Sequence, residues 1–204
     1  MNGKFWFVVL LLIVVLMAGC GKEAGEKPKE VEAGLTKVKL ETSMGDIVLE
    51  LNEDAAPVTV KNFLRYVEEG FYDGTIFHRV IPRFMIQAGG FTPDLKDKEE
   101  HPPIVNEFKL SNVRGTVAMA KKGGKPNSAT SQFFINIADN SRLDSLNGGF
   151  TVFAKVVEGM DVVDSIAAVK TTRKVGTIKG QKLQMRDVPI EPVVIKSAKV
   201  VSAK

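Results

Sequence analysis

Short apolar runs separated by turn-forming residues recur along most of this chain of 204 residues. Gly, Pro, Asn or Asp bounds each run, and short runs between such residues favour strands over helices. The runs are Thr75–Val80, Phe84–Gln87, Thr116–Ala120, Phe133–Ile137 and Phe150–Val156, and Val193–Val201 provides a last strand. Many short strands with few helices predict a mostly-β fold, either a barrel or a sandwich.

Two alternating segments before these runs predict a β-hairpin. Apolar residues alternate with polar or charged ones over Thr36–Thr42 and again over Ile47–Asn52. The residues between them, Ser43–Asp46, supply turn chemistry. We therefore expect two paired strands with one buried face.

Two segments have the character of helices. The first begins at Pro57, where a missing N–H has no cost, and ends at Gly70. Its apolar residues recur at helical spacing and form one stripe: Val60, Phe63, Leu64 and Val67. The second predicted helix is Gly159–Val169. The segments Thr92–Pro103 and Thr171–Pro192 have no regular apolar pattern, so we expect loops there.

The N-terminus has the pattern of an exported protein. After Lys4, the apolar run Phe5–Ala18 is shorter than the ~20 residues of a membrane span and fits the centre of a signal peptide. Small residues before Cys20 resemble the bacterial lipobox, although Met17 stands where that motif more often has Leu. We interpret residues 1–19 as a lipoprotein signal peptide and Cys20 as the lipidation site. The alternative is an uncleaved N-terminal anchor.

The organisation that follows is a tether and one domain. Residues 20–35 contain the acylated Cys and a charged stretch too poor in large apolar groups to order itself. Residues 36–204 form the folded domain. Gly21 is not the Asp that retains some lipoproteins at the inner membrane, so we expect attachment to the outer membrane, facing the periplasm. The outer face of a single cell membrane is the alternative.

Composition excludes several other classes of protein. The formal net charge is +4, and no basic run is interleaved with aromatics, so we expect no nucleic-acid partner. One Cys permits no intrachain disulfide, and one Cys with two His cannot build a Cys/His zinc cluster. No glycine-flanked serine elbow indicates a hydrolase. We predict no metal and no cofactor.

The densest group of polar and aromatic residues lies at Phe77–Gln87, with a second at Ser131–Asn136. Strand alternation places Phe77, Arg79 and Ile81 on one face. An arginine on the same face as two apolar residues either extends to the rim or is held in an apolar groove for a purpose. From these residues alone, a surface arginine and buried phenylalanines remain the ordinary interpretation.

These two stretches resemble the signature of the cyclophilins. Further matches are Asn62-Phe63, Met119-Ala120, Phe153–Val156 and Glu158–Met160. The resemblance runs from about Val38 to Val201. It implies a closed eight-stranded antiparallel β-barrel capped by two α-helices, and this is the predicted fold. It also implies a peptidyl-prolyl cis-trans isomerase that assists the folding of exported proteins.

The resemblance assigns roles to particular residues. Arg79 is the catalytic arginine, and Gln87 is its polar neighbour. The pocket for the substrate proline ring is lined by Phe84, Met85, Phe134 and Leu143. The groove for the peptide backbone is bordered by Ala120, Lys121 and Gln132, with Lys121 acting mainly through its main chain. His78 is interpreted as a hydrogen-bonded structural histidine.

Two positions depart from the family pattern. Arg142 stands where many members have Trp, which predicts weaker binding of the family's cyclic peptide inhibitor, cyclosporin. Phe150 stands where some members have His. We expect a monomer whose partners are proline-containing unfolded or flexible polypeptides, with the membrane contacted through the N-terminal lipid. The alternative function is a proline-peptide-binding chaperone or scaffold with incidental catalysis.

Overall fold

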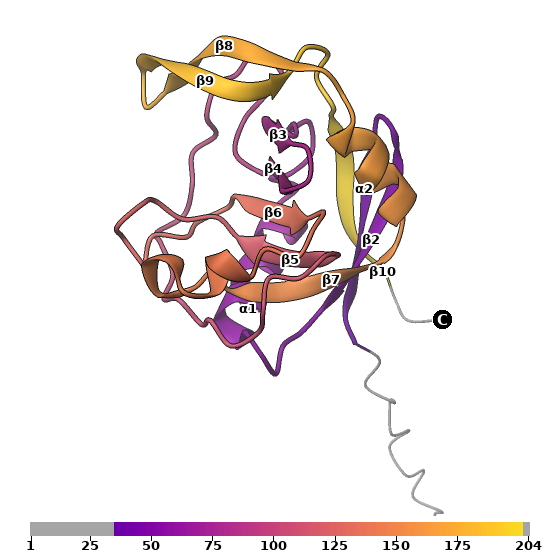
Figure 1. Ribbon diagram of the computed structural model, residues 1–204, viewed down its shortest axis with the longest axis vertical. Helices are drawn as coiled ribbons and strands as arrows, with labels where there is room; N and C mark the ends of the chain where they lie inside the picture. Colours follow the sequence, from indigo (N-terminus) through magenta and orange to yellow (C-terminus); the bar gives the residue numbers. More distant parts are fainter. Residues whose placement is uncertain (1–34, 202–204) are drawn as a thin grey trace, which may run out of the picture. The chain divides into compact units, whose positions relative to one another are not determined.

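Eight strands pair into one strongly curled antiparallel sheet in the computed structural model, which describes residues 35–201 (Figure 1). In order of pairing they are β10 (Ile195–Val201), β1 (Lys37–Thr42), β2 (Gly45–Leu51), β7 (Val152–Glu158), β5 (Thr116–Met119), β6 (Phe133–Asn136), β4 (Met85–Ala88) and β3 (Arg79–Ile81). The predicted hairpin is confirmed as β1 and β2, and the mostly-β fold class is confirmed with it.

The sheet is a half-barrel, and the predicted closed barrel is not formed. The strands β10 and β3 are at opposite ends of the pairing order. Among residues 35–201, the two ends are joined at the isolated bridge between Ile76 and Val194. Main-chain hydrogen bonds flank it, from Phe77 to Val193 (2.9 Å), from Ile195 to Thr75 (2.7 Å) and from Gly74 to Ile195 (2.8 Å). The predicted strand Thr75–Val80 is therefore interrupted, because its first residues make this bridge while only Arg79–Ile81 pairs as a strand.

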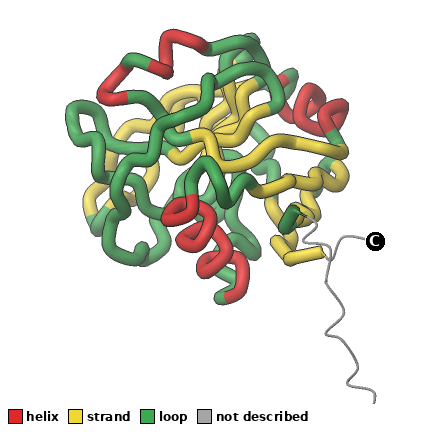
Figure 2. The backbone as a smooth tube through the Cα atoms, turned by 90° about the horizontal axis from the view of Figure 1, so that it is seen from below, coloured by secondary structure: helices red, strands yellow, loops and turns green. Residues whose placement is uncertain are grey.

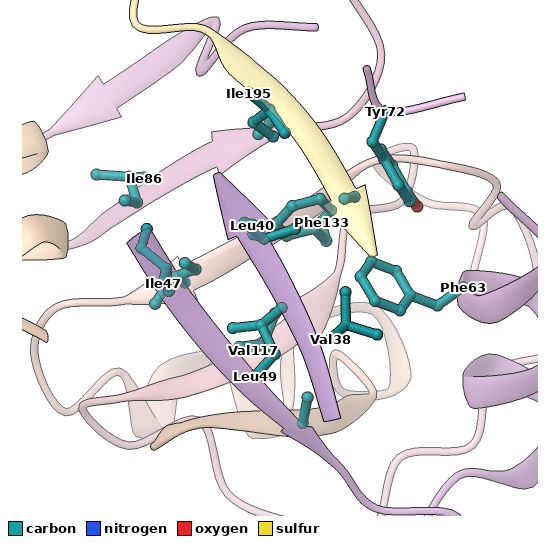
Figure 3. Close-up of a cluster of buried hydrophobic side chains, with 14 of the residues drawn as sticks. Val38, Leu40, Ile47, Leu49, Phe63, Tyr72, Ile86, Val117, Phe133 and Ile195 are labelled. Atoms are coloured by element: carbon teal, nitrogen blue, oxygen red, sulfur yellow. The ribbon is translucent and has the colours of Figure 1, made fainter. Parts of the chain in front are cut away.

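The concave side of the sheet holds the main hydrophobic core. Val38, Leu40, Ile47 and Leu49 alternate toward it from β1 and β2, as their sequence pattern predicts (Figure 3). Phe63 of the first helix lies among them, with its ring 5.6 Å from that of Phe133 in an edge-to-face arrangement. Burial of each such side chain stabilises the fold by roughly 1.5–3 kcal/mol.

Both predicted helices are confirmed, and they lie well apart around the strands (Figure 2). The first, α1 (Pro57–Glu68), packs against β10 and buries Val60, Phe63 and Val67. The second, α2 (Met160–Ala167), packs beside β2 and buries Val163 and Ile166. Two short 3-10 turns, η1 (Ser141–Asp144) and η2 (Leu146–Gly148), precede β7.

The predicted loop Thr171–Pro192 is wrong, because most of it forms a second, two-stranded sheet. Strands β8 (Thr171–Ile178) and β9 (Gln181–Pro189) pair through a two-residue turn, in which Lys179 and Gly180 both have positive φ (51° and 76°). This is the backbone that hairpin turns require. Alternation was not visible in the sequence because most side chains of the hairpin are exposed on both faces.

The segment Thr92–Pro103 contains no strand or helix, as predicted, although Lys96 bridges to Thr177 of the hairpin. Within residues 35–201, no helix is long and apolar enough to cross a bilayer. The predicted signal peptide, Cys20 and nearly all of the tether lie outside the described residues, so these assignments remain predictions.

Candidate active site

Arg79 belongs to a row of side chains that crosses four neighbouring strands on the convex side of the sheet. It lies opposite Gln87 of β4, which in turn lies opposite Phe134 of β6. Phe134 lies opposite Ala118 of β5. Directly opposed residues of antiparallel strands project from the same face, so these side chains are neighbours. The strands that build the row therefore place an arginine beside an amide and an aromatic ring.

The same face carries a hydrophobic cluster separate from the main core, which we call the outer cluster. Its buried members are Met85, Ala118, Phe134, Leu143 and Val152, and its half-buried members are Ile81, Phe84, Ala120 and Phe150. The alternate residues of these strands, such as Val80, Ile86 and Phe133, belong to the main core instead. Strand periodicity thus divides one set of apolar runs between the core and the candidate site.

All four residues predicted to line a proline pocket are members of the outer cluster. Met85 and Phe134 are 2% and 4% exposed, so they form the floor, whereas Phe84 is half-buried at the rim. A cavity of about 400 Å³ adjoins Phe84 and Leu143 and is also lined by Arg142. Met85 and Phe134 do not line this cavity, so the apolar floor and the partly polar cavity are neighbouring features that share Phe84 and Leu143.

The Arg79 guanidinium is half-exposed beside this apolar floor. Its Nε lies 3.9 Å from Oδ2 of Asp187, a residue of β9, and both side chains are 43% exposed. The neighbouring Gln87 donates from Nε2 to Oε1 of Gln132 at 3.0 Å. Sequence reasoning missed Asp187 because it lay in a predicted loop.

The predicted border of the peptide groove is held together by main-chain and side-chain contacts. The Ala120 N–H donates to the Gln132 carbonyl at 2.8 Å, which keeps the two residues adjacent. The ammonium of Lys121 donates to the carbonyl oxygens of Asn147 (2.9 Å) and Gly149. Lys121 thus joins the groove to the turn that follows η1, a role beyond the main-chain one predicted.

Lys121 also covers the aromatic rim of the site. Its Nζ lies 4.8 Å from the centre of the Phe150 ring, which meets the Phe134 ring edge-to-face at 5.7 Å. Burial lowers the pKa of Lys121 below its usual value. The carbonyl oxygens and the aromatic ring stabilise the ammonium in this partly buried place. Phe150 therefore extends the apolar floor to a rim that carries a fixed positive charge.

His78 lies in the interior, next to the catalytic candidate along the chain. Its ring packs 4.7 Å from that of Phe91, and its Nδ1 has no hydrogen-bond partner among the described residues. Burial, and then the charge of Arg79, lower the pKa of His78 to about 3. The imidazole is therefore neutral at ordinary pH. This agrees with a structural role, although one ring nitrogen lacks the hydrogen bond that we expected.

Most of this chain is similar in sequence to one family of proteins. Residues 37–200 match the family described as "Cyclophilin type peptidyl-prolyl cis-trans isomerase/CLD". Peptidyl-prolyl cis-trans isomerase A of Dickeya dadantii is 52% identical over 170 residues, covering 81% of this chain and 85% of the relative. Peptidyl-prolyl cis-trans isomerase B of Escherichia coli is 52% identical, with 80% and 98% covered.

Solved structures with this fold include two from Cryptosporidium parvum. The crystal structure of a cyclophilin type peptidyl-prolyl cis-trans isomerase has a TM-score of 0.66 and 28% identity, covering 83% of this chain and 99% of that chain. A second, in the presence of the dipeptide Ala-Pro, has a TM-score of 0.65 and 27% identity, with 82% and 99% covered.

Proposed function

The chain belongs to the cyclophilin-type peptidyl-prolyl cis-trans isomerase family and is an isomerase of Xaa-Pro bonds, and we propose that Arg79 is its catalytic residue. The outer cluster is the pocket for the proline ring. One observation carries this proposal: Arg79, Gln87 and Phe134 form a continuous row across three strands, on the face opposite to the main core.

The reaction requires no bond to be made or broken. Double-bond character of the peptide C–N bond creates the barrier, and uncatalysed X-Pro isomerisation takes tens to hundreds of seconds. In the twisted state the proline nitrogen becomes pyramidal and gains a lone pair. The Arg79 guanidinium donates to that lone pair and keeps its proton at any relevant pH. A fixed donor beside an apolar floor is therefore the chemistry that the reaction needs.

The size of the barrier shows that Arg79 does not act alone. Raising the rate from ~0.01 s⁻¹ to ~100 s⁻¹ requires about 5 kcal/mol of transition-state stabilisation. One charge-assisted hydrogen bond provides about 1.5–3 kcal/mol. The remainder comes from Met85, Phe134 and Leu143, which hold the ring while the preceding part of the peptide rotates. The guanidinium donor and the pocket that holds the proline ring are therefore both needed for the full rate.

The substrate backbone lies along Ala120, Lys121 and Gln132. The side-chain amides of Gln87 and Gln132 hold each other, which keeps one face of the groove polar beside the apolar floor. Arg142 and Phe150 replace the rim residues expected from the family. They leave the row of Arg79 unchanged, so they alter which peptides and inhibitors bind more than the isomerisation step itself.

The test of this proposal compares Arg79→Ala with Arg65→Ala in a protease-coupled or NMR exchange assay on a short Ala-Pro peptide. Arg65 is an exposed arginine of α1 that pairs with Glu69, so it controls for loss of an arginine elsewhere. Arg79→Ala is expected to lower kcat/KM by about 10- to 100-fold with an unchanged circular dichroism spectrum. Equal rates in the two variants would overturn the assignment and favour a peptide-binding scaffold.

We further propose that the enzyme is exported and anchored by a lipid on Cys20, facing the periplasm, where it acts on exported proteins. The support is the apolar run Phe5–Ala18 followed by small residues and Cys20. Mass spectrometry of the N-terminal peptide is expected to find an acylated Cys20 in membranes, and Cys20→Ser is expected to leave the chain unacylated. An intact, unmodified Met1 on the wild-type chain argues against this location.

A further inference from the structure

Asp187 lies in an irregular part of the β8–β9 hairpin. Thr172 pairs with Val188, but the next pair is Lys174 with Met185, so Arg186 and Asp187 together face Arg173. This is a β-bulge, which bends a strand and redirects a side chain. Asp187 has φ of +57°, a left-handed conformation that Asp and Asn adopt more readily than other residues with a side chain. Bulges and such backbone conformations concentrate at functional sites.

The charge of Asp187 is also exceptional for its surroundings. Between Thr171 and Pro189 the hairpin contains five basic residues, and Asp187 is its single acidic residue. The exposed basic side chains of the hairpin are solvated by water, so the hairpin does not require this carboxylate for its own stability. The bulge turns that carboxylate toward β3, the strand that carries Arg79, and β9 packs beside β3.

The contact with Arg79 is one-sided. Within residues 35–201, Asp187 supplies the only carboxylate within 4.0 Å of this guanidinium, and the contact of 3.9 Å is made by Nε. A guanidinium has five N–H donors in a fixed plane, four of them on the two terminal nitrogens. A carboxylate at the Nε edge therefore favours one orientation of the plane and leaves the terminal nitrogens available for a substrate.

We propose that Asp187 is a positioning residue for isomerisation, which holds the Nε edge of Arg79 so that the terminal nitrogens point at the twisted Xaa-Pro bond. This inference rests on the proposed function, because it assigns no role to Asp187 apart from Arg79. A half-exposed arginine has many rotamers. An ion pair at one edge favours a subset of them before the substrate arrives.

Asp187→Asn is the informative variant. Asn has the same shape and is one of the few residues that adopts a positive φ readily, so the bulge is retained while the charge is lost. Asp46→Asn is the matched control, because Asp46 pairs with Lys39 at 2.6 Å near the β1–β2 turn and its loss changes the net charge equally. Both variants are made in the full chain and assayed on an Ala-Pro peptide.

Asp187→Asn is expected to lower kcat by about three- to tenfold with less than a twofold change in KM, as for loss of a part-exposed ion pair that acts on the transition state. Asp46→Asn is expected to retain wild-type kcat. The Nε–H resonance of Arg79 is expected to broaden in Asp187→Asn and to remain unchanged in the control.

A double-mutant cycle separates positioning from general structure. In an Arg79→Lys background, Asp187→Asn is expected to have no further effect on kcat. An unchanged or increased kcat in Asp187→Asn alone would overturn the inference, and so would an equal loss in both backgrounds. Failure of the proposed function is distinct, because it requires Arg79→Ala to retain activity. Loss of activity in Arg79→Ala with full activity in Asp187→Asn rejects only the role of Asp187.

Discussion

Acidification is expected to destabilise the fold through His78. The imidazole is buried and neutral in the folded chain, with a pKa of about 3, whereas its ordinary value is 6.5. Between these two values the unfolded chain binds a proton that the folded chain does not. The contribution that neutral His78 makes to the free energy of unfolding is therefore fully present above pH 6.5, and it is lost progressively as the pH falls from 6.5 toward 3.

The magnitude follows from the two pKa values of His78. At pH 5, about 1.5 units below the pKa of His78 in the unfolded chain, protonation stabilises the unfolded state. The free energy of unfolding therefore falls by about 2 kcal/mol relative to pH 7.5. For a domain of this size, that loss lowers Tm by about 4–8 °C. Hydrogen bonds and ion pairs lower the pKa of Asp94, Asp144 and Asp164 below 3.8, so those carboxylates remain ionised at pH 5.

The assay is urea unfolding at pH 7.5 and pH 5, followed by circular dichroism, on wild type, His78→Gln and His101→Gln. His78→Gln removes the buried titrating group and is expected to flatten most of the pH dependence while lowering stability at pH 7.5. His101→Gln removes the chain's other histidine, which is partly exposed, and leaves the buried His78 in place, so a loss of stability at pH 5 is expected to persist. A wild type that is equally stable at both pH values, or a His78→Gln variant with the full difference, would refute this reasoning.

Three further predictions concern the walls of the site. Phe134→Ala is expected to lower kcat/KM in the peptide assay and to lower the free energy of unfolding by about 3 kcal/mol in urea. Phe133→Ala is expected to lower the free energy of unfolding by a similar amount, with a smaller effect on the kcat/KM of the folded protein. Lys121→Met keeps the apolar stem but removes the ammonium from two main-chain carbonyls, so KM is expected to rise with kcat nearly unchanged. Arg142→Trp is expected to tighten cyclosporin binding in a calorimetric titration, and unchanged affinity would show that this rim position is not decisive.

Local patterns in the chain predicted much of the architecture. Alternation of Val38 and Leu40 with charged residues predicted β1, and the stripe of Val60, Phe63 and Val67 predicted the buried face of α1. These predictions succeed because strand and helix periodicity depend on neighbouring residues and on which face meets the core. The motif around Arg79 predicted the family and brought forward the residues that the strands then place in one row.

Other features depend on contacts between distant parts of the chain. Exposed strands such as β8 and β9 leave no apolar alternation, so their pairing was decided by main-chain hydrogen bonds and a turn with positive φ. No ladder pairs β3 with β10, so the sheet stays a half-barrel. Among the described residues its two ends are linked by one isolated bridge with a few flanking main-chain hydrogen bonds, an arrangement that no local pattern encodes.

The amino-acid sequence by itself therefore determined the class of fold, the family and the choice of Arg79 as the candidate catalytic residue. Only the tertiary structure decided that the Phe150 ring meets the Phe134 ring edge-to-face, and that Asp187 reaches Arg79. The physical reason is that periodicity assigns residues to faces, whereas register and bulges between strands far apart in sequence decide which side chains share a face and meet.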